Sequence, residues 1–200
     1  FFYALIAMTC LYGCFIGFGS AITLQANLTA LAARRCVTPT HKLKLILSEQ
    51  IASFLLGYFD VIVLLIYLRY ILKLDFQGKI GSMLLISFFG SLIGVSIGIF
   101  VGSLGKMKEG GKIGIILGFS MVCSFLSGLM NNTMKDLVEK NMPVINRINP
   151  AALISDAFYC INVYNDPARY YRNVLTLAVM SAALVFASFL LIRRNRYDSI

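Results

Sequence analysis

The chain has 200 residues and a formal net charge of +9; 58% of its residues are hydrophobic, 14% are charged, and the mean hydropathy is +0.80. Soluble domains are roughly 45–50% apolar and about 25% charged, so this composition excludes a soluble globular domain and indicates an integral membrane protein. The basic residues lie at the ends of apolar runs, which explains the net charge without nucleic-acid binding.

Five apolar runs are each close to the roughly 20 residues that a membrane-spanning helix needs. The first run starts at residue 1, with no initiator Met and no basic residue ahead of it, which argues against a secretory signal peptide. It also suggests that a helix precedes this segment. We therefore predict an all-α integral membrane protein, a single domain over residues 1–200. The predicted spans are residues 1–24, 45–68, 80–105, 113–134 and 173–192.

A short basic segment with one proline, RRCVTPTHK, follows the first span. Basic residues cluster in three short segments on this side of the membrane, whereas those of the other side are mostly spread over one long connection. Because dense basic segments resist translocation, we place this side, with the C-terminus, in the cytoplasm. The three segments are residues 34–44, 106–112 and 193–196.

The second span contains the best candidate for a functional charge. Asp60 lies near its middle, while Glu49 and Arg69 lie near its ends. A charge at mid-membrane is costly, so we expect Asp60 to face the bundle interior or a wet cavity. A substrate or coupling role and a plain interhelical hydrogen bond both remain open.

The third span carries a glycine at every fourth position. Such a stripe lets another helix pack closely, which is the interpretation that we favour over a water or ion path. Gly114 and Gly118 repeat the spacing in the fourth span. The stripe consists of Gly90, Gly94, Gly98 and Gly102.

The connection over residues 131–168 is too long for a turn, and its apolar residues follow a helical period. They predict two short helices, the second starting after Asn149 with Pro150 at its first position and containing Asp156. A turn at Pro167 is expected to follow. Backbone that dips into a membrane must be buried in protein, so we expect these helices to form a re-entrant lid over a pathway.

No motif for chemistry appears in the sequence. Gly105-Lys106 and Gly111-Lys112 lack the flanking residues of a phosphate-binding loop, and there is a single histidine, His41. The five cysteines form no CxxC pair and predict neither a metal site nor a disulfide framework. We expect no enzymatic activity and no cofactor on this chain.

The order and spacing of four segments resemble the type-2 ABC transporter permeases, the membrane subunits of ATP-driven exporters. The segments are QANLTALAARRCVTPTHKLKLILSE, FVGSLGKMKEGGKIGIILGFSM, RINPAALISDAFY and the ending RRNRYDSI. The resemblance implies the C-terminal part of a six-helix permease, in which two re-entrant elements close the pathway on the outer side.

By this resemblance, residues 30–42 contain a cytoplasmic coupling helix that docks on an ABC ATP-binding subunit, where ATP and Mg would bind. A second permease copy or a homologue would complete a dimer in the plasma membrane. The expected ATPase contacts are Arg34, Arg35, Thr38, Pro39, Thr40, His41 and Lys42.

We therefore expect a permease that exports an amphipathic or hydrophobic substrate (a drug, peptide or lipid) by alternating access. Tyr58, Asp60 and Tyr67 are the pathway candidates. The main alternative is a stand-alone channel or secondary transporter that uses Asp60 as a relay. A non-transporting membrane anchor or sensor is a third possibility.

Overall fold

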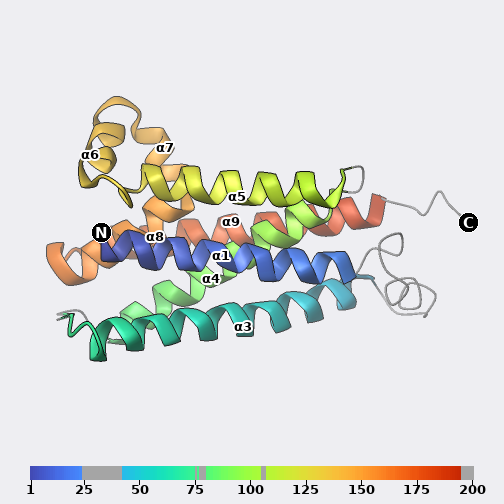
Figure 1. The fold of residues 1–200 in the computed structure, drawn as a ribbon, viewed down its shortest axis with the longest axis horizontal. Coiled ribbons are helices and arrows are strands. Elements are labelled where there is room, and N and C mark those ends of the chain that lie inside the picture. Colours follow the sequence, from blue (N-terminus) through green and yellow to red (C-terminus); the bar gives the residue numbers. More distant parts are fainter. Residues whose placement is uncertain (24–41, 75, 77–79, 105–106, 195–200) are drawn as a thin grey trace, which may run out of the picture.

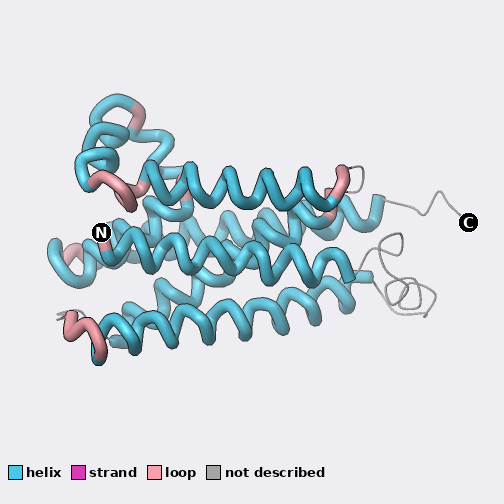
Figure 2. Tube along the Cα trace, in the orientation of Figure 1, coloured by secondary structure: helices cyan, strands magenta, loops and turns pink. Residues whose placement is uncertain are grey.

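The computed structural model describes residues 1–23, 42–74, 76, 80–104 and 107–194. All regular structure in these ranges is helical (Figure 2). Five helices are long and apolar enough to cross a membrane. The prediction of an all-α membrane protein with five spans is therefore confirmed.

The spanning helices alternate in direction and form a bundle (Figure 1). Three short α-helices and one π-helical turn separate the fourth and fifth. The spanning helices are α1 (Phe2–Thr23), α3 (Lys42–Tyr70), α4 (Ile80–Gly102), α5 (Glu109–Leu126) and α9 (Pro167–Arg194), and the short elements are α6 (Asn132–Asn141), α7 (Pro143–Ile148), α8 (Pro150–Tyr159) and η1 (Cys160–Tyr164).

Two predicted boundaries are wrong. Helix α5 ends at Leu126 rather than near residue 134, because Gly128 takes a positive φ of 94° that stops the helix. Helix α9 begins at Pro167, where a turn was expected. Asp166 Oδ1 accepts a hydrogen bond from the Arg169 backbone N–H at 3.1 Å and so caps the helix, with Pro167 at its first position.

Helix α4 is the centre of the bundle. It packs against α1, α3, α5, α8 and α9, and 67% of its most apolar window is buried, against 28% or less for α3, α5 and α9. The other spans therefore keep one face open to the membrane, whereas α4 is enclosed by protein.

Helices α1 and α4 approach each other almost backbone to backbone. A Cβ placed on Gly94 would overlap the Cys10 carbonyl oxygen, and one on Gly98 would overlap the Cys14 carbonyl oxygen. From the α1 side, a Cβ on Gly17 would likewise meet the Val95 carbonyl. The glycines of the stripe thus face α1, as expected for close packing of helices in membranes.

The other glycines of α4 and α5 do not lie against the backbone of a neighbouring helix as closely as Gly94 and Gly98 do. Gly90 and Gly102 meet side chains rather than backbone, from α1 and, at Gly90, also from α8. Gly114 and Gly118 of α5 have nothing within 4 Å of an added Cβ, so they pack against no helix among the described residues.

Polar side chains join the spans at a few points. Gln50 Nε2 donates a hydrogen bond to Ser96 Oγ at 3.1 Å, which links α3 to α4. The Ser20 and Ser53 hydroxyls lie 2.5 Å apart and link α1 to α3. Hydrogen bonds of this kind are each worth on the order of 1 kcal/mol in a membrane, so they fix register while packing holds the bundle.

The two ends of the bundle differ in construction. Helices α6, α7 and α8 lie at the end where α1 begins, and the ends of α1, α4 and α9 lie at the other (Figure 1). The α6–α8 segment is therefore at the opposite end of the bundle from the end of α1 and the start of α3.

Candidate functional site

The segment from α6 to η1 folds back into the bundle. Helix α8 packs against α1, α4, α5 and α9, and every residue from Pro150 to Phe158 is buried. Helices α6 and α8 lie where two short helices were expected, whereas α7 and the π-helical turn were not anticipated. Because α8 is enclosed by spanning helices, it closes this end of the bundle.

Asn149 sets where α8 begins. Its Oδ1 accepts a hydrogen bond from the Ala151 backbone N–H at 2.9 Å, as an N-cap, and Pro150 occupies the first helical position. Its Nδ2 donates to the carbonyl oxygen of Cys123 at 2.9 Å, near the end of α5. One buried amide thus joins the start of α8 to the end of α5.

We expect Asn149→Asp and Asn149→Ala to separate these two roles. Aspartate keeps the capping oxygen but loses the amide donor, and it places a carboxylate beside the Cys123 carbonyl; alanine loses both contacts. Loss of the cap costs about 1 kcal/mol, and loss of a buried hydrogen bond about 1–3 kcal/mol. Thermal unfolding in detergent should show both variants below wild type, with a lower melting temperature for aspartate at neutral pH than at acidic pH. A wild-type melting temperature for Asn149→Ala would contradict this role.

A buried carboxylate in α8 gathers the strongest polar contacts of the segment. Asp156 is 7% exposed. Lys135 Nζ of α6 lies 3.1 Å from its Oδ1. Arg169 of α9 binds both oxygens, with Nε 2.7 Å from Oδ2 and Nη2 2.9 Å from Oδ1. Asn173 Nδ2 of α9 donates to Oδ2 at 2.9 Å.

The electrostatics of this cluster favour the ionised carboxylate. Burial alone would raise the pKa of Asp156, but the charge of Lys135, the hydrogen bonds from Asn173 and Lys135, and the charge of Arg169 together lower this pKa below its ordinary value. Lys135 Nζ also lies 4.6 Å from the centre of the Tyr159 ring, a cation–π geometry. The cluster therefore locks α6, α8 and α9 together around one negative charge.

The pathway candidates on α3 do not form one group. Asp60 is exposed on the outer face of α3, with Tyr67 two turns further along the same face. Of the two expected surroundings of Asp60, the bundle interior is therefore wrong for the single chain, and the wet cavity stays a prediction. Tyr58 faces the other way: it stacks on Phe54 with ring centres 5.7 Å apart, and its hydroxyl donates to the Leu84 carbonyl of α4 at 3.4 Å.

The predicted ATPase contacts, Arg34 through His41, lie outside the described residues. Lys42 is the first residue of α3, and its side chain is likewise not described. In the sequence, the predicted coupling segment falls between the end of α1 and the start of α3.

Lys112 is a buried charge that the sequence did not predict. Lys112 in the first turn of α5 is 1% exposed, and its Nζ donates to the carbonyl oxygen of Gly102, the last residue of α4, at 2.8 Å. A cation at a helix C-terminus satisfies an unpaired carbonyl and the helix dipole. Hydropathy placed Lys112 in a connection outside the predicted spans, so its burial could not be predicted.

The sequence of this bundle matches a known family of membrane proteins. Residues 1–190 match the model of the ABC-2 family transporter proteins, and the chain belongs to that family. It is therefore a multi-pass membrane permease subunit of an ABC transporter, a family that implies association with an ATP-binding subunit. No curated protein and no solved structure matches the chain.

Proposed function

We propose that this permease exports an amphipathic or hydrophobic substrate by alternating access, as one half of a dimer with a second copy or a homologue. The observation that carries the proposal is the family match over residues 1–190. ATP and Mg would bind to the ATP-binding subunit, and this chain would convert closure of that subunit into movement of its helices.

The exposed face of α3 supports a path between two permeases. Phe59, Val63 and Tyr67 are each more than 40% exposed there, and Asp60 is exposed among them. A carboxylate at this depth is costly in contact with lipid, so it needs a polar partner or water. A second permease facing α3 would enclose Asp60 in a pathway between the two copies, with Tyr67 beside it.

Helix α8 and the Asp156 cluster would form the outer closure of this path. The substrate would enter from the cytoplasm or the inner leaflet. ATP-driven displacement of the coupling segment would then tilt α1 and α3 and open the pathway on the α8 side. We infer that the C-terminus lies in the cytoplasm and that the membrane is the plasma membrane; the density of basic residues near residues 34–44 supports the orientation.

The test is charge reversal at the proposed docking site, Arg34→Glu with Arg35→Glu. We expect loss of the ATP-binding subunit from the detergent-extracted complex and uncoupling of ATP hydrolysis from transport, because two glutamates would replace the positive charges of the proposed contact. The measurement is affinity purification of the permease with mass spectrometry of the proteins that accompany it.

A matched control reverses two exposed basic residues at the other end of the bundle, Lys140→Glu with Arg172→Glu. This control should retain the ATP-binding subunit. Recovery of wild-type permease alone, under conditions that preserve other ABC complexes, would contradict the proposal. Transport that persists without an ATP-binding subunit and loses its pH dependence in Asp60→Asn would instead favour the channel or secondary transporter.

A further inference from the structure

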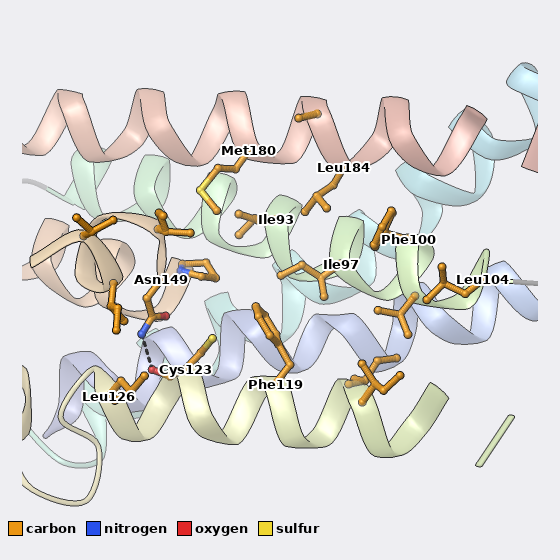
Figure 3. A pocket seen from close by; sticks show the side chains of 18 residues that line it. Ile93, Ile97, Phe100, Leu104, Phe119, Cys123, Leu126, Asn149, Met180 and Leu184 are labelled. Atoms are coloured by element: carbon orange, nitrogen blue, oxygen red, sulfur yellow. Dashed lines mark hydrogen bonds between the residues drawn. The ribbon is translucent and has the colours of Figure 1, made fainter. Parts of the chain in front are cut away.

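A groove of about 720 Å³ lies between α4, α5 and α9, away from the α3 face (Figure 3). Its volume is within the range of roughly 300–1,000 Å³ that is typical of small-molecule sites. Side chains of α4 form its floor, and α5 and α9 form its walls. The residues that define these three sides are Ile93 and Ile97, Phe119 and Cys123, and Met180 and Leu184.

This groove opens sideways from the bundle. Ile93 and Ile116 on its inner side are fully buried, whereas Phe119 is 43% exposed and Ile148 of α7 is 62% exposed. Because α4, α5 and α9 are all long and apolar enough to span a membrane, we expect the opening to face its hydrocarbon. The medium that reaches the groove is therefore lipid.

A basic residue, Arg147, belongs to α7, the short helix that lines one end of the groove, although Arg147 is not itself a lining residue. Val144, Ile145 and Ile148 of this helix line the groove. Arg147 lies between them in sequence and is exposed. Within the described part of the chain, its guanidinium makes no ion pair or hydrogen bond, unlike that of Arg169. The polar atoms of Asn149 at this end already bond to Ala151 and Cys123.

We propose that the groove binds one acyl chain of an anionic phospholipid, with the phosphate of its headgroup at Arg147. The apolar walls match an acyl chain, and the guanidinium of Arg147 matches the phosphate of an anionic headgroup. A lipid in this position would hold α7 against α5 and α9. The proposal goes beyond the transport function and does not depend on it, because it concerns the surface of a single permease.

The test uses the full chain in phosphatidylcholine nanodiscs that contain phosphatidylglycerol with a photoreactive group in its acyl chain. Illumination should label peptides of α5 and α9. Ala183 lines the groove and is exposed. We expect Ala183→Trp to fill the groove and reduce labelling about tenfold, and Ala183→Leu to reduce it less. Ala182→Trp, the neighbouring exposed alanine that does not line the groove, should label like wild type.

The headgroup contact has a separate readout. Arg147→Gln should lower the preference for photoreactive phosphatidylglycerol over photoreactive phosphatidylcholine about fivefold, as expected for one basic residue at a lipid surface. Arg172→Gln, an exposed arginine of α9 at the same end, should leave the preference unchanged. Unchanged labelling in both Ala183 variants would overturn the proposal. Equal preference in Arg147→Gln and wild type would overturn the headgroup assignment.

A protein occupant gives a different pattern. If a second permease copy fills the groove, Ala183→Trp should break the dimer, as seen by size-exclusion chromatography, while lipid labelling of the wild-type groove stays at background. That result would also overturn the proposal.

Discussion

Gly98→Ala is expected to destabilise the bundle by about 3 kcal/mol, the upper end of the usual range for overpacking, because one added methyl group meets backbone rather than a movable side chain. The Cβ would overlap the Cys14 carbonyl oxygen of α1, and it also lies close to the Cα of Cys14. Helix α1 would have to move away from α4 along the whole contact. Gly94→Ala should behave alike, since its Cβ would overlap the Cys10 carbonyl oxygen.

Gly81→Ala is the matched control because it lies in the same helix with nothing within 4 Å of its added Cβ. Alanine has the better helix propensity by up to about 1 kcal/mol, so this variant should be neutral or slightly more stable than wild type. The measurement is thermal unfolding in mild detergent, followed by circular dichroism. Equal melting temperatures for Gly98→Ala and Gly81→Ala would show that α1 and α4 are not in backbone contact.

Asp156→Asn should have the second large effect, a loss of about 2–3 kcal/mol. Removing one partner of a buried ion pair costs about 3–5 kcal/mol; the value here is lower because the Arg169 side chain is 40% exposed and partly screened by solvent. The variant leaves Lys135 and Arg169 close together without the carboxylate charge between them. Limited proteolysis should then cut the α6–α7 region faster than in wild type.

The same carboxylate should make stability depend on pH. Its pKa in the folded protein lies below the ordinary aspartate value of about 3.9, so its stabilisation is complete above that value. The stabilisation is lost as the pH falls through the folded-state pKa. Melting temperatures should therefore fall in this acidic range for wild type, and Asp156→Asn should lack this component.

Asp166→Asn is the control for both measurements. Asp166 is exposed, and asparagine retains the oxygen that caps α9, so its stability should stay near wild type. A pH dependence of Asp156→Asn that equals that of wild type would assign the acid transition to another group.

The spans could be predicted because a membrane imposes one strong rule, about 20 apolar residues for each crossing. The start of α8 could also be predicted, since Asn149 and Pro150 form a local helix-start signal. The direction in which Asp60 points could not, because α3 is apolar on nearly all sides and its sequence has no polar face to orient it. The contacts of Asp156 could not be predicted for a related reason, because Lys135, Arg169 and Asn173 meet it only through tertiary packing.

The glycine contact between α1 and α4 has a mechanical consequence. Two helices separated by layers of side chains can slide as rotamers change, but backbone pressed against backbone has no such soft layer. Helices α1 and α4 should therefore move as one rigid body. The hydrogen bond from Lys112 to the Gly102 carbonyl joins the start of α5 to the end of this pair. A force applied where α1 connects to α3 would therefore tilt α1 and α4 together instead of bending either helix locally. This tilt would displace α8 at the opposite end of the bundle.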